Sequence, residues 1–381
     1  MNNPKLVNWQ EQMKVLPTHF RQSEDFFIHQ LNDLSTIFSD KYGYGLLSMP
    51  GENKGPDIQI REDSAGDIEV SLYRCNAVTA SGNRIHFIAA NEDKPIRKIY
   101  SPAHEAPSRI KEMTCMDIIL TVNPFERVAV GELNPHESPP RHPDCEELYS
   151  LHITPSGELN IPSFGAHYLV IGRILKQGEM YIADNNYIPP CREMQGHPEL
   201  AEYYKKFDRQ IYKLQKASLC IIGKVSNKPN GNELAASISL LSETIVKYIA
   251  SIHFIFKNYS TSLAPVMITN YISTMAYHCF LMITSLSGIK KEELLRYFYE
   301  WSDITPGSFE ELLANTLKIE YDHSNIRPLM LRLEVFLSTM SNLLERLSHL
   351  EYIGQHKESL VVSEREEDQN QEQKKDWFIT N

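Results

Sequence analysis

The stretch Asp184-Asn185-Asn186-Tyr187-Ile188-Pro189-Pro190-Cys191 separates two parts of the chain that differ in character. Before it, short apolar runs are broken at close intervals by Gly, Pro, Asn and Asp, a pattern typical of strands. After it, apolar residues recur in alternating steps of four and three, which is typical of helices. Two adjacent prolines fit neither a sheet ladder nor a helix interior, because both lack an N–H and fix φ. The sequence therefore predicts an α+β chain, a β-sandwich followed by a helical bundle or coiled coil.

This division predicts four segments. Residues 1–42 form a lead and a helix, 43–191 a β-sandwich, 192–353 a helical domain, and 354–381 a charged, disordered tail. Strands are expected at residues 44–49, 58–61, 68–74, 85–89, 115–122, 127–132, 148–153, 168–175 and 180–183, with Asn123-Pro124 as one of the turns between them. Residues 136–143 are expected to form a long loop stiffened by prolines.

A first helix is predicted to start at Pro17 or Thr18 and to end before Gly43 and Gly45. Its apolar residues fall on one face at helical spacing, namely Phe20, Phe27, Leu31, Leu34 and Phe38. The lead that precedes it carries one large aromatic residue, Trp9.

Beyond the joint, three stretches keep an apolar period of 3.5 residues, the seam of a coiled coil or tight bundle. The first two give the candidate seam residues Leu200, Tyr204, Phe207, Ile211, Leu214, Leu234, Ile238, Leu241, Ile245 and Tyr248. The third runs through Leu329, Leu333, Phe336, Met340, Leu343, Leu347 and Leu350. Helices of one subunit can satisfy such seams, but three seams in one chain favour packing between subunits as well.

Composition excludes several classes of protein. The net charge is −11 and no Lys/Arg-dense run occurs, which argues against a nucleic-acid partner. The polar N-terminus has no export signal, and the six cysteines lack paired spacing, so reduced thiols in the cytoplasm are expected. Residues 260–289 carry no formal charge and are long enough to span a bilayer. Polar residues within them, such as Asn270 and His278, favour a helix buried in a bundle or an oligomer.

The end of the chain changes composition after Val362, where a long run without apolar residues cannot form a core. It closes on Trp377-Phe378-Ile379, so Trp377 and Phe378 form either a short docking motif or an ordinary frayed end.

The sequence offers no catalytic constellation, and we expect no enzyme activity, cofactor, metal or small-molecule substrate. No phosphate-binding, zinc-protease or nucleophile-elbow motif is present. His136, His142 and Cys145, with His152 beyond them, match no common zinc spacing. Cys191 is expected to be a buried thiol. Asp322 and His323 are adjacent and cannot face each other on a helix, which argues against a catalytic dyad, so Asp322 is expected to be a helix cap. A hydrolase that uses His136, His142 and Cys145 is a distant alternative.

Three stretches resemble the TssK family, the baseplate subunit of the type VI secretion system. Residues 9–22 are similar to its opening pattern W-x-E-G-M-x-L-x-P-Q-H-F-Q-Q, although Gln12 stands where the family has glycine. Residues 168–174, Asp184 and Tyr187-Ile188-Pro189-Pro190-Cys191 resemble L-x-I-A-R-I … D-x-x-F-I-P-P-C. Tyr321-Asp322-His323 resembles the Y-D-H that precedes the last bundle helix of the family.

The resemblance implies a cytoplasmic homotrimer at the inner membrane, with a sandwich "shoulder" that holds the wedge proteins TssF and TssG, a helical "neck", and a C-terminal "head" that meets a membrane-anchoring complex. So few residues follow the last predicted helix that a short variant without the head is expected. The candidate wedge-binding residues are Trp9, Met13, Leu16, Pro17, His19 and Phe20. Packing of this lead against the sandwich is an equally good account of the aromatic residues. A phage-tail-like receptor-binding or adaptor protein is the alternative function.

Overall fold

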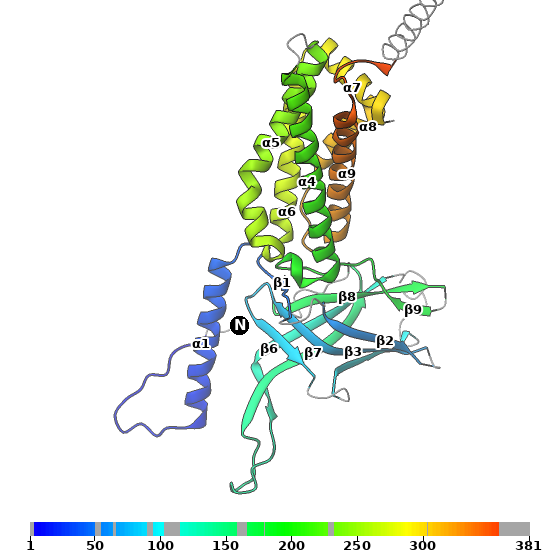
Figure 1. The fold of residues 1–381 in the computed structure, drawn as a ribbon. Helices are drawn as coiled ribbons and strands as arrows, with labels where there is room; N and C mark the ends of the chain where they lie inside the picture. The colour runs from blue at the N-terminus through cyan, green and yellow to red at the C-terminus, as the bar shows by residue number, and fades with distance from the viewer. Residues whose placement is uncertain are drawn as a thin grey trace, which may run out of the picture. The chain divides into compact units, whose positions relative to one another are not determined.

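The computed structural model describes residues 4–49, 55–63, 66–89, 94–102, 115–157, 166–178, 180–227, 232–302 and 304–357 (Figure 1). The chain divides into two compact units. The β unit comprises Met1–Ala201 with Thr261–Val266 and Asp322–Arg327, and the helical unit comprises Glu202–Ser260, Met267–Tyr321 and Pro328–Asn381. The tail beyond residue 357, with Trp377 and Phe378, lies outside the described residues.

The β unit contains helix α1 (Pro17–Phe38) and two antiparallel sheets. In the first sheet, β3 (Ile68–Val78) pairs with all the others, which are β1 (Gly45–Leu46), β2 (Asp57–Glu62), β4 (Arg84–Ile88) and β5 (Ile96–Tyr100). The second sheet has the order β7-β6-β8-β9, made of β7 (Asp144–Pro155), β6 (Cys115–Val130), β8 (Tyr168–Gln177) and β9 (Met180–Ala183).

The two sheets pack face to face around one apolar core. Ile68, Val70 and Leu72 of β3 are fully buried, as are Ile118 and Leu120 of β6. A Cβ added at Gly172 of β8 would lie 3.2 Å from Cδ1 of Ile58 on β2, so the backbone of one sheet closely approaches side chains of the other. The predicted sandwich followed by helices is therefore confirmed.

Two details of the strand prediction are wrong. Residues 115–122 and 127–132 are not separate strands, because β6 runs through Asn123-Pro124 without turning and ends at Val130. The register shifts between Asn123 and Arg127, so Pro124 sits in a bulge where its missing N–H costs no ladder bond. Strand β5 was not predicted. Its consecutive charged residues Arg97 and Lys98, both exposed in the structure, interrupt the alternation of apolar and polar residues that indicates a strand.

The joint at residues 184–191 is anchored to the start of the first sheet. The Leu46 N–H donates to Pro190 O (2.8 Å), and the Arg192 N–H donates to Leu46 O (3.0 Å). Gly45 has φ of 115°, and a Cβ there would lie 2.4 Å from Pro190 O. Only glycine therefore allows the two backbone segments to approach this closely.

The helical unit is built from α4 (Pro198–Ser226), α5 (Glu233–Tyr259), α6 (Pro265–Ser285), α7 (Gly288–Ser302), α8 (Pro306–Leu317) and α9 (Ile326–His349). The long helices α4, α5, α6 and α9 run alongside one another (Figure 1), and hydrogen bonds tie Tyr204 of α4 to Phe256 of α5 and Tyr248 of α5 to Tyr271 of α6. Two helices, Glu233–Ser262 and Pro265–Ser285, are long and apolar enough to cross a membrane, and about half of the apolar window of each is buried inside the bundle (44% and 50%).

Candidate interaction surface on the lead and helix α1

The lead folds back onto the first turn of α1. The ring of Trp9 meets that of His19 edge-on at 5.9 Å and that of Phe20 at 6.3 Å. The Gln22 side chain donates to Lys5 O (2.8 Å), and the Leu16 N–H donates to Nδ1 of His19 (3.3 Å). Lead and helix thus form one small cluster of aromatic side chains.

The six predicted wedge-binding residues all belong to this cluster or its edge. Trp9, Leu16, Pro17 and Phe20 are exposed, and Met13 and His19 are half-buried. Trp9 and Phe20 each keep more than half of their surface exposed (51% and 56%), although they touch each other. Such an exposed pair of large aromatic side chains is typical of a site for another protein.

Helix α1 contacts the rest of the β unit through polar groups. Arg127 of β6 forms ion pairs with Glu24 and with Asp25, the latter at 3.0 Å. Asn32 donates to Oδ1 of Asn83 (2.7 Å). Sequence reasoning missed these contacts, because no local pattern links α1 to residues so far along the chain. No residue of α1 is buried.

The other two family-like stretches form internal contacts instead. At the joint, the Arg173 Nε–H donates to the buried carboxylate of Asp117 (2.8 Å), and the Arg173 guanidinium lies 4.1 Å from the ring of Tyr187. The Asp184 N–H donates to Arg173 O (2.8 Å). These groups hold the joint against β8.

His323 locks the third stretch onto the β unit. Its Nε2 contacts Tyr44 O (2.9 Å), its ring meets that of Tyr44 edge-on at 4.6 Å, and burial lowers its pKa. Asp322 accepts from the Ser324 N–H (2.9 Å), in the turn that precedes α9 (Ile326–His349). The prediction that Asp322 caps the helix is therefore wrong, because its carboxylate is used in that turn.

A cavity of about 390 Å³ lies beside the joint, between β2, β8 and the start of α4. Arg173, which lines the cavity, is paired with Asp117, and Glu199, which also lines it, is paired with Arg327. Burial and then the charge of Arg327 lower the pKa of His197, on its rim, to about 4. The charges at this cavity are thus satisfied within the chain.

The ten predicted seam residues, from Leu200 to Tyr248, are all buried within a single chain. They pack the helices of one bundle against one another. A contact between copies of the chain therefore needs other residues.

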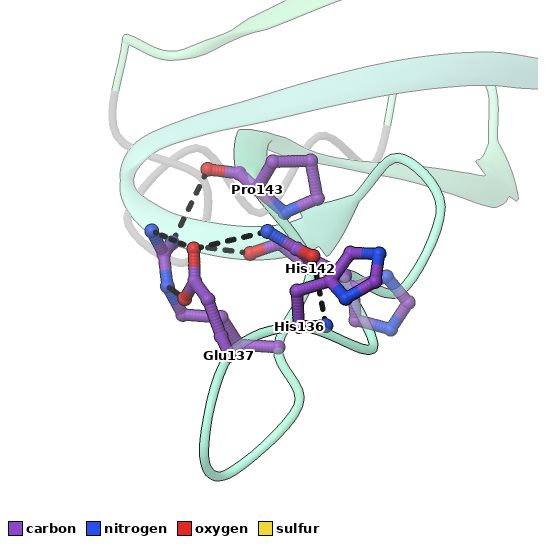
Figure 2. Close-up of polar contacts among 6 residues, drawn as sticks. His136, Glu137, His142 and Pro143 are labelled. Atoms are coloured by element: carbon purple, nitrogen blue, oxygen red, sulfur yellow. Dashed lines mark hydrogen bonds and ion pairs between the residues drawn. The ribbon is translucent and has the colours of Figure 1, made fainter.

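The histidine loop between β6 and β7 is held by its own side chains (Figure 2). Arg141 pairs with Glu137, and the imidazole Nδ1 of His142 contacts Gly131 O (2.8 Å). Cys145 lies exposed on β7, and His152 contacts the Thr121 hydroxyl (3.2 Å). In the part of the chain that the structure describes, no group of His, Cys, Asp or Glu is arranged to hold a metal ion. Cys191 is fully buried, as predicted, and burial raises the pKa of its thiol.

No protein-family model matches the chain, and no curated protein matches its sequence. Among solved structures, a crystal structure of TssK is 17% identical and covers 88% of this chain and 68% of its own, with a TM-score of 0.54. This chain has the fold of TssK. A TssK solved in a TssK–TssF–TssG baseplate subcomplex of the type VI secretion system is 14% identical, covering 90% of this chain and 99% of that one, with a TM-score of 0.47. A TssK from EAEC in complex with a nanobody is 13% identical, covering 86% and 99%, with a TM-score of 0.47.

The TssK resemblance of the lead has a backbone explanation at Gln12. Its φ is 62°, the left-handed region that glycine occupies without strain. The glycine of the TssK pattern falls at this position. Gln12 therefore adopts the backbone conformation that favours the glycine of the TssK pattern, although it carries a side chain.

Proposed function

We propose that this protein is a TssK-type structural subunit of a type VI secretion baseplate. The proposal rests on the TssK fold over 88% of the chain and on which of the three TssK-like stretches are exposed. Two of them form internal contacts, through Arg173 at the joint and through His323 with Tyr44, whereas the first is exposed around Trp9 and Phe20. The exposed TssK-like stretch, residues 9–22, is therefore the one that is available to bind a partner.

In this proposal the lead cluster binds the wedge formed by TssF and TssG. Trp9, Leu16, Pro17 and Phe20 supply an apolar surface, with Met13 and His19 at its edge. The protein works as a cytoplasmic homotrimer at the inner membrane and links the wedge to a membrane-anchoring complex. Its role is to hold surfaces in place, which needs no cofactor and no catalytic residue.

Co-purification tests this function. The tagged full chain is co-expressed with the TssF and TssG proteins encoded beside it, and the bound fraction is measured. Wild type is expected to retain both proteins. The Trp9→Ala/Phe20→Ala variant is expected to bind at least about tenfold more weakly, since central aromatic residues of interfaces contribute about 2 kcal/mol or more each.

The matched control is Ile99→Ala, an exposed apolar residue on β5, away from the lead (61% exposed). It should bind as wild type does. If the folded wild-type chain retains neither TssF nor TssG, the proposed function is wrong.

A further inference from the structure

The cavity beside the joint lies wholly within the β unit and reaches between the two sheets. Its volume of about 390 Å³ falls within the range of about 300–1,000 Å³ that is usual for ligand pockets. Gly55 and Gly172 contribute to its lining without filling it. The apolar side chains that line it come from both sheets and are those of Ile58, Ile60, Ile118 and Ile171. The cavity thus has room for a small molecule with an apolar body.

His197, which also lines the cavity, holds a ring nitrogen without a partner. Its Nδ1 is buried and accepts or donates no hydrogen bond within the part of the chain that the structure describes. Burial, reinforced by Arg327, lowers the pKa of the imidazole to about 4, so the ring is neutral near pH 7. A neutral imidazole carries one proton. On Nδ1 that proton would stay unpaired, because neither water nor a protein acceptor reaches this atom, so the proton belongs on Nε2.

The Nε2 edge of the His197 ring faces Gly55. A Cβ added at Gly55 would lie 3.3 Å from Cδ2 and 3.9 Å from Nε2 of His197. Glycine therefore leaves space in front of this edge of the imidazole, on the side of a residue that itself lines the cavity. From there the Nε2–H can donate to an acceptor that enters the cavity, such as a carbonyl oxygen.

The charged groups around the cavity are already matched with one another. Arg173 pairs with Asp117, and Arg327 pairs with Glu199. The carboxylate of Asp184 accepts from the backbone N–H two residues further along (2.9 Å). An anion would have to compete with these carboxylates for the guanidinium groups, and a cation would lie close to both guanidinium groups. Because a buried charge needs a partner of its own, the cavity suits an uncharged molecule.

We propose that this cavity binds a small uncharged molecule that has an apolar body and a hydrogen-bond acceptor such as a carbonyl oxygen. The isoleucines of the two sheets contact its body, and the Nε2–H of His197 donates to its acceptor. The site is separate from the lead cluster, and the inference does not depend on the proposed baseplate role.

Saturation-transfer NMR of the full chain tests the chemistry of this site. The three probes are benzamide, benzoate and benzylammonium, which share a ring and a similar size but differ in charge. Benzamide should bind with a Kd of about 1 mM or lower, as expected for so small a ligand. Benzoate and benzylammonium should bind at least about tenfold more weakly, because each brings a net charge into the cavity.

Three variants locate the site. Ala183→Phe places a large ring at an exposed position of the cavity lining and should abolish benzamide binding. Its control is Ala129→Phe, at an exposed position on β6 outside the lining, which should bind as wild type does. His197→Phe keeps a ring but removes the donor, and should weaken benzamide binding about threefold to tenfold. His197→Gln retains a side-chain N–H and should bind more tightly than His197→Phe.

Folding of each variant is checked by its thermal unfolding. A folded wild type that binds no benzamide at concentrations up to about 10 mM overturns the inference. Equal binding of the three probes, or undiminished benzamide binding by Ala183→Phe, also overturns it. So does a folded Ala183→Phe that no longer retains TssF and TssG while wild type binds no benzamide, because the wedge then covers the cavity. The proposed function is tested separately, by co-purification of the wild-type chain with TssF and TssG.

Discussion

At Gln12 the backbone adopts φ of 62°, which costs a residue with a side chain roughly 1–2 kcal/mol relative to glycine. Glycine recovers this strain but loses about 0.5–1 kcal/mol of chain entropy on folding. The turn that follows Trp9 therefore depends on the positive φ at residue 12 more than on the contacts of the Gln12 side chain.

Substitutions at Gln12 test this account. Gln12→Gly should leave the lead folded or stabilise it by up to about 1 kcal/mol, whereas the β-branched Gln12→Val should loosen it. The readout is the rate of trypsin cleavage after Lys14. Gln10→Val, where φ is not positive, is the control and should cleave at the wild-type rate. Equal rates for Gln12→Gly and Gln12→Val would contradict the assignment.

His197 makes stability depend on pH. Burial, reinforced by Arg327, lowers its folded-state pKa to about 4, while the unfolded value is about 6.5. Above pH 6.5 both states are neutral at this residue and the contribution is constant. As pH falls from about 6.5 to 4, the unfolded state takes up the proton first, so stability falls, by an amount on the order of 2–3 kcal/mol.

Urea unfolding between pH 4.5 and 7.5 measures this loss. His197→Gln, which does not titrate, should show a shallower decrease toward acid, with the remaining slope due in part to His323, whose pKa burial also lowers. An unchanged slope in His197→Gln would show that His197 is not kept neutral by its surroundings.

Among the elements, α1 shows most clearly what sequence can and cannot predict. Its bounds and its apolar stripe followed from the spacing of Phe27, Leu31 and Leu34, because helix periodicity is local. Which side of α1 faces the sandwich could not be predicted from this spacing, because the orientation of the helix depends on contacts with Arg127 and Asn83, far along the chain. For the same reason the sequence suggested the lead cluster but missed the contacts that hold it to α1.

The strands repeat this lesson. Alternation predicted most of them, but Asn123-Pro124 looked like a turn and proved to be a bulge in β6. Whether Pro124 ends a strand depends on the register of β7, which only the assembled sheet determines. The change from strands to helices, between β9 and α4, falls around the two prolines of the joint, which restrict the backbone in any context.

Arg127→Ala should release α1 while leaving the sandwich folded. Hydrogen exchange of the α1 amides should speed up, since Glu24 and Asp25 lose their partner, and the global free energy of unfolding should change by only about 1 kcal/mol. Arg141→Ala, which breaks the ion pair to Glu137 in the β6–β7 loop, is the matched control. Equal α1 exchange in both variants would mean that Arg127 does not hold the helix.

For the molecule as a whole, the two units are suited to different tasks. The helical unit buries its predicted seams, as at Phe207 and Ile238, and is a closed bundle. The β unit leaves its lead and the apolar face of α1 exposed. The exposed surfaces of the β unit are the ones that the proposed baseplate role uses.

The most direct test of the baseplate proposal is the mass of the purified full chain by light scattering, alone and after mixing with TssF and TssG from the same locus. The account predicts three times the subunit mass of 43.8 kDa alone, and a heavier complex containing all three proteins on mixing. A folded protein whose mass does not change on mixing would contradict it.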